Sequence, residues 1–100
     1  MKISILTPDK EVFQGSVSSV KVPGSMGTFQ VLNQHAPIVS SLEKGTVTLV
    51  TDGTPYRYFD AGSSTIQEGK EAGKSIEFDI SGGFIEVLNN NISLLVRGVK

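Results

Sequence analysis

The sequence lacks cysteine and tryptophan, and its 100 residues include only two methionines and one histidine. Without cysteine it can form neither a disulfide framework nor a thiolate metal site, which excludes the small secreted scaffolds that depend on them. It also lacks a run of about 18 apolar residues, the length that a membrane span needs. The apolar stretch at residues 1–6 is too short for the core of an export signal. We therefore expect an intracellular chain with no direct membrane insertion.

An excess of charge of one sign is also missing, because nine basic side chains stand against ten acidic ones. A chain with a net charge of −1 has no long-range positive field, so we expect no binding to nucleic acid. Hydrophobic residues make up 38% of the chain and charged residues 19%, which are ordinary globular proportions. No linker, repeat or low-complexity tract divides the chain. The sequence predicts a single domain over residues 1–100.

The hydrophobic residues recur at every second position, which is the period of a half-buried strand. These sets are Ile3 and Ile5, Val20 and Val22, Val47 and Leu49, Phe78 and Ile80, Ile85 and Val87, and Ile92, Leu94 and Val96. The pattern and its Gly, Pro and Asn turns predict ten strands, near residues 2–6, 10–15, 17–22, 28–32, 38–42, 45–51, 55–60, 75–81, 83–88 and 91–96. So many short apolar strands must stack in two sheets or close up. We expect an all-β fold, a ten-stranded β-sandwich or flattened barrel without a helical domain.

Residues 61–74 differ from the rest, because they are rich in Ser, Gly, Glu and Lys and poor in large apolar residues. This composition predicts an exposed excursion, either a polar hairpin or a mobile loop. The segment contains the Gly-Lys-Ser end of a phosphate-binding loop. However, only three residues separate Gly69 from Gly73 where that motif needs four, and residues 76–80 alternate like a strand instead of opening a helix. We interpret it as a solvated turn and expect no bound cofactor.

No constellation of residues suited to catalysis or metal binding is visible. His35 lies in a turn-like stretch, residues 33–37, without carboxylates or histidines at metal-ligand spacing and without a nucleophile motif. Glu77 and Asp79 share one face of a predicted strand, and we favour a solvated face over a glycosidase pair because few aromatic residues are available to stack a sugar. We expect no catalytic residue and no metal site, and we favour a binding or structural protein.

Three segments carry a more specific signal. Residues 22–37 run from a Pro-Gly-x-x-Gly loop to a His-Ala-Pro turn, residues 81–87 read Ser-Gly-Gly-Phe-Ile-Glu-Val, and residues 7–15 read Thr-Pro-Asp-Lys-Glu-Val-Phe-Gln-Gly. Together they resemble the epsilon subunit of F-type ATP synthase. The resemblance covers residues 1–60 and 76–96, and residues 61–75 look like a polar insertion.

The resemblance implies a ten-stranded β-sandwich at the foot of the central stalk, in contact with the gamma subunit and the ring of membrane c subunits. It implies a noncatalytic subunit that is not a homo-oligomer. Such a subunit fastens gamma to the c ring, so that proton-driven rotation is coupled to ATP synthesis. The implied location is the cytoplasmic face of the bacterial plasma membrane, reached peripherally through the complex.

The resemblance also supplies contact candidates. Four of them form one loop: Ser25, Met26, Gly27 and Thr28. This loop is expected to face the polar loops of the c ring, with Gly24 and Gly27 free to adopt positive φ, although a plain hairpin turn is the alternative. The candidates for contact with the ring or gamma are Val31, Leu32, His35, Ala36 and Pro37. For Gly82, Gly83 and Phe84 we favour a bulge or close backbone packing over an interface.

Members of this family commonly continue into a two-helix domain that inhibits ATP hydrolysis and sometimes binds ATP. The sequence given ends at residue 100, so we expect a short form with the β-sandwich alone, although a shortened piece of a longer chain would read the same. The alternative function is a free-standing β-sandwich module that binds a peptide or carbohydrate. Its aromatic candidates would be Tyr56 and Tyr58, which share one face of a single strand.

Overall fold

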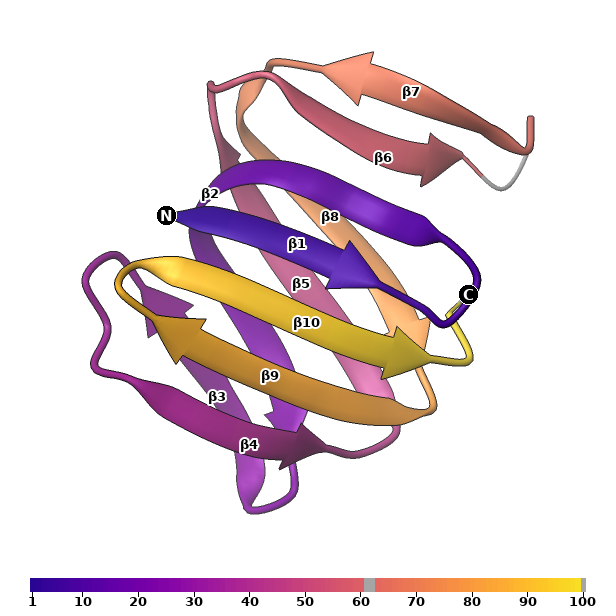
Figure 1. Cartoon of the computed structure of the whole chain (residues 1–100). Helices are drawn as coiled ribbons and strands as arrows, with labels where there is room; N and C mark the ends of the chain where they lie inside the picture. The colour runs from indigo at the N-terminus through magenta and orange to yellow at the C-terminus, as the bar shows by residue number, and fades with distance from the viewer. Residues whose placement is uncertain (61–62, 100) are drawn as a thin grey trace.

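The computed structural model describes residues 1–60 and 63–99, which form strands and turns (Figure 1). The strands are β1 Lys2–Leu6, β2 Glu11–Gly24, β3 Gly27–Leu32, β4 Ile38–Leu42, β5 Gly45–Asp52, β6 Tyr56–Asp60, β7 Thr65–Gly69, β8 Ala72–Ile80, β9 Gly82–Leu88 and β10 Asn91–Arg97. The predicted all-β fold class is confirmed. Within these residues no helix has the length and hydrophobicity that crossing a bilayer would require.

Two layers share the long strand β2. Its first half pairs with β1 and β6, and its second half pairs with β3 and β5. The front layer in Figure 1 runs in the order β7, β6, β2, β1, β10, β9 and β4, and the rear layer in the order β3, β2, β5 and β8. Because β2 belongs to both layers, it fixes their position relative to each other. The resulting sandwich measures 35 × 27 × 19 Å.

The core lies between the layers and is filled by side chains at alternating positions. The sets with a two-residue period are buried, except that Phe78 is only partly buried. The front layer contributes Ile3, Ile5, Ile85, Val87, Ile92, Leu94 and Val96, and the rear layer contributes Val20, Val22, Val47, Leu49 and Ile80. Full burial of such a side chain stabilises the fold by about 1.5–3 kcal/mol. The strand period therefore decides which side chains form the core.

Two strands expected at residues 10–15 and 17–22 are one continuous strand, β2. The break between them that was expected at Gly15 was wrong. This glycine does not form a turn but allows β2 to lie close to β6, since an added Cβ would lie 2.5 Å from Cβ of Tyr56. The change of layer occurs slightly later, at a register shift between Val17 and Ser19 in the pairing with β5. A bulge of this kind bends the strand from one layer into the other.

The polar excursion contains a strand that the sequence did not predict. Thr65–Gly69, β7, pairs antiparallel with β6, and β8 begins at Ala72 instead of residue 75. The described part of the segment is mostly exposed, as expected, but it forms a hairpin only together with β6, whose residues 56–60 precede it. Part of the segment, residues 61–62, lies outside the described residues. The hairpin extends the front layer beyond β2 (Figure 1).

Tyr56 fastens this hairpin to the core. Its ring is 2% exposed and stacks on Phe13 with 5.4 Å between centroids. Its hydroxyl donates to Oε2 of Glu71 at 2.6 Å. Burial, followed by this hydrogen bond, raises the pKa of Tyr56 to about 12, and the same bond lowers the pKa of Glu71. Thr51 donates to the Glu71 carbonyl and accepts from the Lys74 N–H at 3.0 Å, so the turn between β7 and β8 is also bonded to β5.

Candidate functional site

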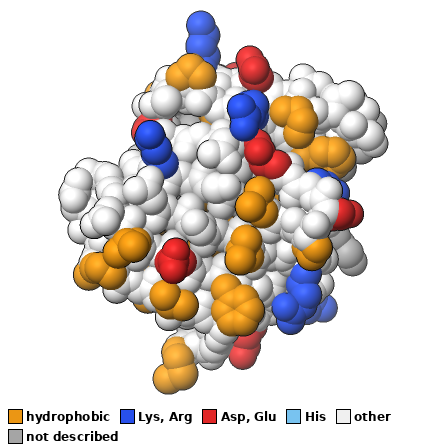
Figure 2. Space-filling model, in the orientation of Figure 1, with side chains coloured by type: hydrophobic (Ala, Val, Ile, Leu, Met, Phe, Trp, Pro, Cys, Tyr) orange, Lys and Arg blue, Asp and Glu red, His pale blue; other side chains and the backbone are white. Residues whose placement is uncertain are grey.

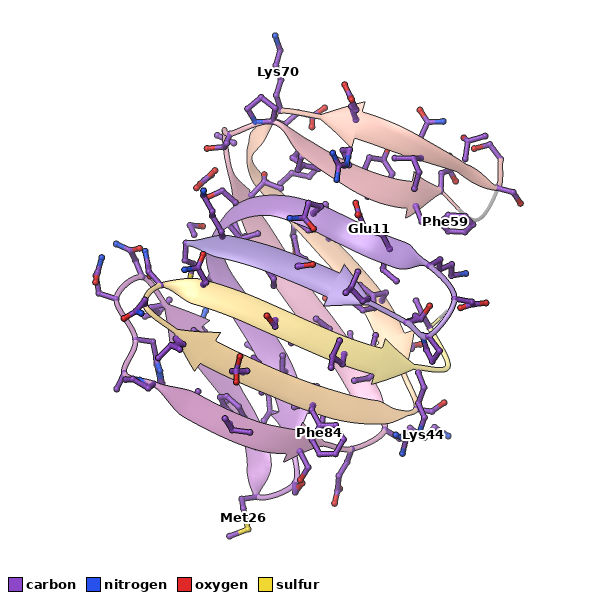
Figure 3. The ribbon with its side chains drawn as sticks, in the orientation of Figure 1. Glu11, Met26, Lys44, Phe59, Lys70 and Phe84 are labelled. Carbon is purple, nitrogen blue, oxygen red and sulfur yellow. The ribbon has the colours of Figure 1, made fainter. Side chains whose placement is uncertain are left out.

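The β2–β3 turn forms a stiff, protruding tip. Met26 is fully exposed at its end and points away from the sandwich (Figure 3). Beside it, Oγ of Ser25 lies 2.6 Å from Oγ of Ser41, and the Ser25 N–H donates to the Ser41 carbonyl at 3.2 Å. These bonds attach the tip to β4. The tip therefore presents one flexible thioether on a backbone that is held in place.

The two glycines that flank this tip have different roles. Gly27 has a φ of +121° and open space where a Cβ would be, so the expected backbone freedom is confirmed for it. For Gly24 the expectation was wrong, because its φ is not positive. An added Cβ at Gly24 would lie 2.6 Å from Cε1 of Phe29, so glycine is needed there for room.

The second group of candidates lies at the other end of β3, in the turn before β4. The His35 N–H donates to the Leu32 carbonyl at 3.1 Å, and its Nδ1 lies 2.7 Å from the Ala36 carbonyl oxygen. The Gln34 N–H donates to Oδ1 of Asn90 at 2.9 Å, which ties this turn to the β9–β10 turn. The exposed side chains of the group are Leu32, Ala36 and Pro37, while His35 is half-buried.

The structure does not bring all nine candidates together. The tip and the turn are separated by the length of β3, roughly 17 Å for its six residues. Val31, the second-to-last residue of that strand, is fully buried in the core. Its side chain supports the strand and is not available to a partner, so the Val31 side chain must be withdrawn as a contact candidate. The remaining candidates form two separate surface patches.

Sequence reasoning missed a set of exposed apolar side chains on the outer surface of the front layer, which we call the apolar face. It consists of Leu6, Val39, Phe84, Leu88 and Leu95. Leu6, Leu95 and Phe84 are direct neighbours across β1, β10 and β9 and form a row. Figure 2 shows hydrophobic side chains gathered on this side, and a shallow depression of about 350 Å³ lies along the row. The closeness of β9 and β10 depends on Gly83, where an added Cβ would overlap the Leu95 carbonyl oxygen, which confirms close backbone packing there.

Runs of consecutive apolar residues were the signal that would have revealed this face. Leu94, Leu95 and Val96 follow one another on β10, and Phe84 and Ile85 do so on β9. Adjacent side chains on a strand point to opposite faces, so one residue of each such pair must face outward.

The polar candidates point to water and do not assemble a reactive site. Asp79 accepts a hydrogen bond from Thr46 at 2.8 Å, and Glu77 accepts one from Thr48 at 3.3 Å, both on the outer surface of the rear layer. Within residues 1–60 and 63–99 no three metal-binding side chains cluster. The Gly-Lys-Ser segment lies inside β8, so it opens no helix toward a phosphate. Tyr56 is buried and offers no surface for stacking a sugar.

Comparisons with known proteins agree with this architecture. The family described as "ATP synthase, Delta/Epsilon chain, beta-sandwich domain" matches residues 1–67. The ATP synthase epsilon chain of Salinibacter ruber is 31% identical over 100 residues, which are 100% of this chain and 60% of that one. The ATP synthase epsilon chain of Chlorobium limicola is 35% identical over 99 residues, which are 99% of this chain and 91% of that one. The chain thus spans about 60% of the first relative and most of the second.

A solved structure shares the fold. It is the Euglena gracilis mitochondrial ATP synthase, OSCP/F1/c-ring in rotational state 1, in which one chain superposes with a TM-score of 0.74 at 19% identity. The superposition covers 98% of this chain and 51% of that chain, and at this identity it concerns the fold alone. The family match over residues 1–67 and the epsilon-chain relatives above 30% identity establish the family. This chain belongs to the ATP synthase delta/epsilon chain family, by its β-sandwich domain.

Proposed function

We propose that this chain is a noncatalytic central-stalk subunit of a proton-translocating ATP synthase, in which it fastens the gamma subunit to the c ring. Its family and the names of its relatives support this role. In this role the chain is peripheral at the cytoplasmic face of a bacterial plasma membrane. It transmits torque between two larger bodies, so that proton-driven rotation reaches the catalytic subunits.

The construction of the sandwich suits a part that is loaded by torque. A strand shared by both layers resists sliding of one layer over the other, and a close-packed core resists compression. The turns at both ends of β3 are also held in place. Ser25 in the β2–β3 tip is bonded to Ser41 on β4, and Gln34 in the β3–β4 turn is bonded to Asn90 in the β9–β10 turn. A force applied at one surface is therefore passed to the other with little deformation.

The apolar face is the observation that carries the proposal, and we assign it to the gamma subunit. A contiguous row of Leu and Phe on the outside of a sheet marks an interaction surface, since water does not favour it. Phe84 is 56% exposed beside the depression, where a side chain of the partner would fit. Aromatic residues at the centre of an interface commonly contribute most of its binding energy.

The two patches of contact candidates extend this arrangement. The β3–β4 turn is bonded to the β9–β10 turn, close to Leu88 at the end of β9, so it continues the surface assigned to gamma. The Met26 tip projects beyond the sandwich and is assigned to the polar loops of the c ring (Figure 3). One chain then holds both partners through two different surfaces.

Binding to the cognate gamma subunit tests the proposal, with Phe84→Asp as the variant and Ile66→Asp as its matched control. The two side chains are similarly exposed, at 56% and 51%, but Ile66 lies on β7, outside the apolar face. Titration calorimetry should show at least about tenfold weaker binding for Phe84→Asp and unchanged binding for Ile66→Asp. Both variants should melt at the temperature of the unchanged protein. Failure of the unchanged protein to bind gamma would overturn the function, and equal effects of the two variants would overturn the assignment of the face.

A further inference from the structure

The front layer extends further than the rear layer on the side of the hairpin. β6 and β7 continue the front layer beyond β2, whereas the rear layer ends at β8. Among the described strands β8 pairs only with β5. Its other edge therefore presents backbone N–H and C=O groups without a neighbouring strand, which is a template for pairing with another segment.

An apolar groove of about 230 Å³ runs between this edge and the hairpin. Its walls include Phe13 on β2, Tyr58 on β6, and Ile76 and Phe78 on β8. Ile76, Phe78 and Tyr58 are only partly buried, whereas Ile80 at the end of β8 is 2% exposed. The sandwich is thus closed at one end of β8 and open along the rest of that strand.

Two lysines lie beside the aromatic rings of this opening. Nζ of Lys10 is 4.3 Å from the centroid of Phe59, and Nζ of Lys74 is 6.0 Å from the centroid of Tyr58. Lys10 comes from the segment before β2 and Lys74 from the start of β8, so the two cations approach the opening from different elements.

Three acids lie near this positive rim, and each carboxylate accepts a hydrogen bond from a residue outside the groove wall. Asp9 accepts from Thr7 at 2.7 Å and is close enough to Lys10 for the lysine to contribute to its lowered pKa. Glu77 contributes to the wall, but its carboxylate is bonded to Thr48 on the outer surface of the rear layer. Glu71 is close enough to Lys74 for the lysine to contribute to its lowered pKa, and its carboxylate accepts the Tyr56 hydroxyl. A ligand with an apolar centre and acidic ends would complement the opening in shape and charge.

We propose that the free edge of β8 binds a short extended peptide, which adds as one more strand to the rear layer. Main-chain hydrogen bonds to β8 supply affinity, and alternate apolar side chains enter the groove. Acidic residues at the two ends of the peptide lie near Lys10 and Lys74. The groove is lined by residues of β2, β6 and β8, together with Lys10 before β2 and Val99 after β10. None of these residues belongs to the apolar face, so the site is separate from the surface assigned to gamma.

The probe is a synthetic peptide of about eight residues that alternates valine with threonine and has glutamate at each end. Added to the isotope-labelled full chain, it should shift backbone amide resonances of β8 and β6 and slow hydrogen exchange along β8. Only one edge of the peptide pairs with β8. N-methylation of one alternate set of its amides should therefore weaken binding at least about tenfold, and methylation of the other set should have little effect.

A double variant, Lys10→Glu with Lys74→Glu, should weaken peptide binding about three- to tenfold. Lys44→Glu is the matched control, since Lys44 is exposed in the turn between β4 and β5 (Figure 3). Phe84→Asp should leave peptide binding unchanged, which separates this site from the proposed function. The inference is overturned if about 1 mM peptide shifts no β8 resonance, or if both methylated peptides bind alike. It is also overturned if β8 becomes protected simply on raising the protein concentration, because the occupant would then be a second copy of the chain.

Discussion

The two outer surfaces of the sandwich differ in how they meet water. The rear layer pairs Thr46 with Asp79 and Thr48 with Glu77 across β5 and β8, and each hydroxyl donates to its opposing carboxylate. The front layer instead carries the apolar face, in which leucine and phenylalanine side chains lie side by side without cover. Polar cross-strand pairs stabilise a surface that stays solvated, whereas a contiguous exposed apolar row is typical of an interaction surface. The contrast accords with the proposed function, in which the front layer contacts gamma and the outer surface of the rear layer stays in solvent.

Gly83→Ala should have the largest effect, because it disrupts the pairing of β9 with β10, the strands that carry Phe84 and Leu95 of the apolar face. A Cβ at this position would overlap the Leu95 carbonyl oxygen and lie 2.9 Å from Cα of Val96, so β9 and β10 must separate. We expect the free energy of unfolding to fall by about 3 kcal/mol or more in denaturant titrations. Binding to gamma should weaken as well, since Phe84 and Leu95 would no longer be aligned.

Gly73→Ala on β8 is the matched control for that variant. Gly73 has a positive φ of 73° but open space around its missing Cβ, so the change introduces backbone strain without a clash. We expect a loss of about 1 kcal/mol and unchanged binding to gamma. A Gly83→Ala protein as stable as Gly73→Ala would contradict the packing role assigned to Gly83.

Leu95→Ser should have the next largest effect and tests the contrast between the two surfaces directly. The residue is 53% exposed in the middle of the row, so truncation removes partner contacts and leaves the core intact. Affinity for gamma should fall roughly five- to thirtyfold in titration calorimetry. Lys21→Ser, an exposed change on the rear layer opposite Thr48, should leave the affinity unchanged. If Lys21→Ser weakened binding as much, the two surfaces would not be specialised as described.

Tyr56→Phe tests how firmly the hairpin is joined to the two layers, and its effect should depend on pH. The Tyr56 hydroxyl lowers the pKa of Glu71 below its ordinary value of 4.5. The bond therefore stabilises the folded state fully above about pH 4.5, and the contribution is lost as pH falls through the lowered value. Near neutral pH we expect Tm to drop by roughly 3–6 °C. The difference from the unchanged protein should shrink below pH 4 in thermal scans, and a pH-independent difference would exclude the bond to Glu71 as its cause.

The strands that could be predicted from the sequence were those that bury one side in the core and expose the other side to solvent. Residues such as Ile92 and Leu94 alternate and are flanked by turns, so their strand was predicted from local pattern alone. Gly15 was misinterpreted because glycine marks both a turn and a close approach of backbones. Thr65–Gly69 was not predicted as a strand because none of its side chains is buried in the core, so its structure comes from pairing with β6.

The candidate site was less predictable for a related reason. The resemblance to the family pointed to both ends of β3, because its motifs include the loop that ends at Gly27 and the turn that contains His35. The row formed by Leu6, Leu95 and Phe84 joins residues from three strands that are distant in sequence. Their adjacency depends on the parallel pairing of β1 with β10, which no local pattern specifies.

Thr46→Val should have the smallest effect. It tests whether the polar pairs on the rear surface contribute to the stability of the sheet. The hydroxyl bond to Asp79 at 2.8 Å is exposed, so water replaces it when it is lost, and valine is as suitable as threonine for a strand. We expect the free energy of unfolding to change by less than about 0.5 kcal/mol in denaturant titrations and binding to gamma to stay the same. A loss above about 1.5 kcal/mol would mean that the polar pairs hold β8 on β5. The polar pairs would then be needed for the stability of the sheet. Their presence would no longer indicate that the rear surface faces solvent in an assembly.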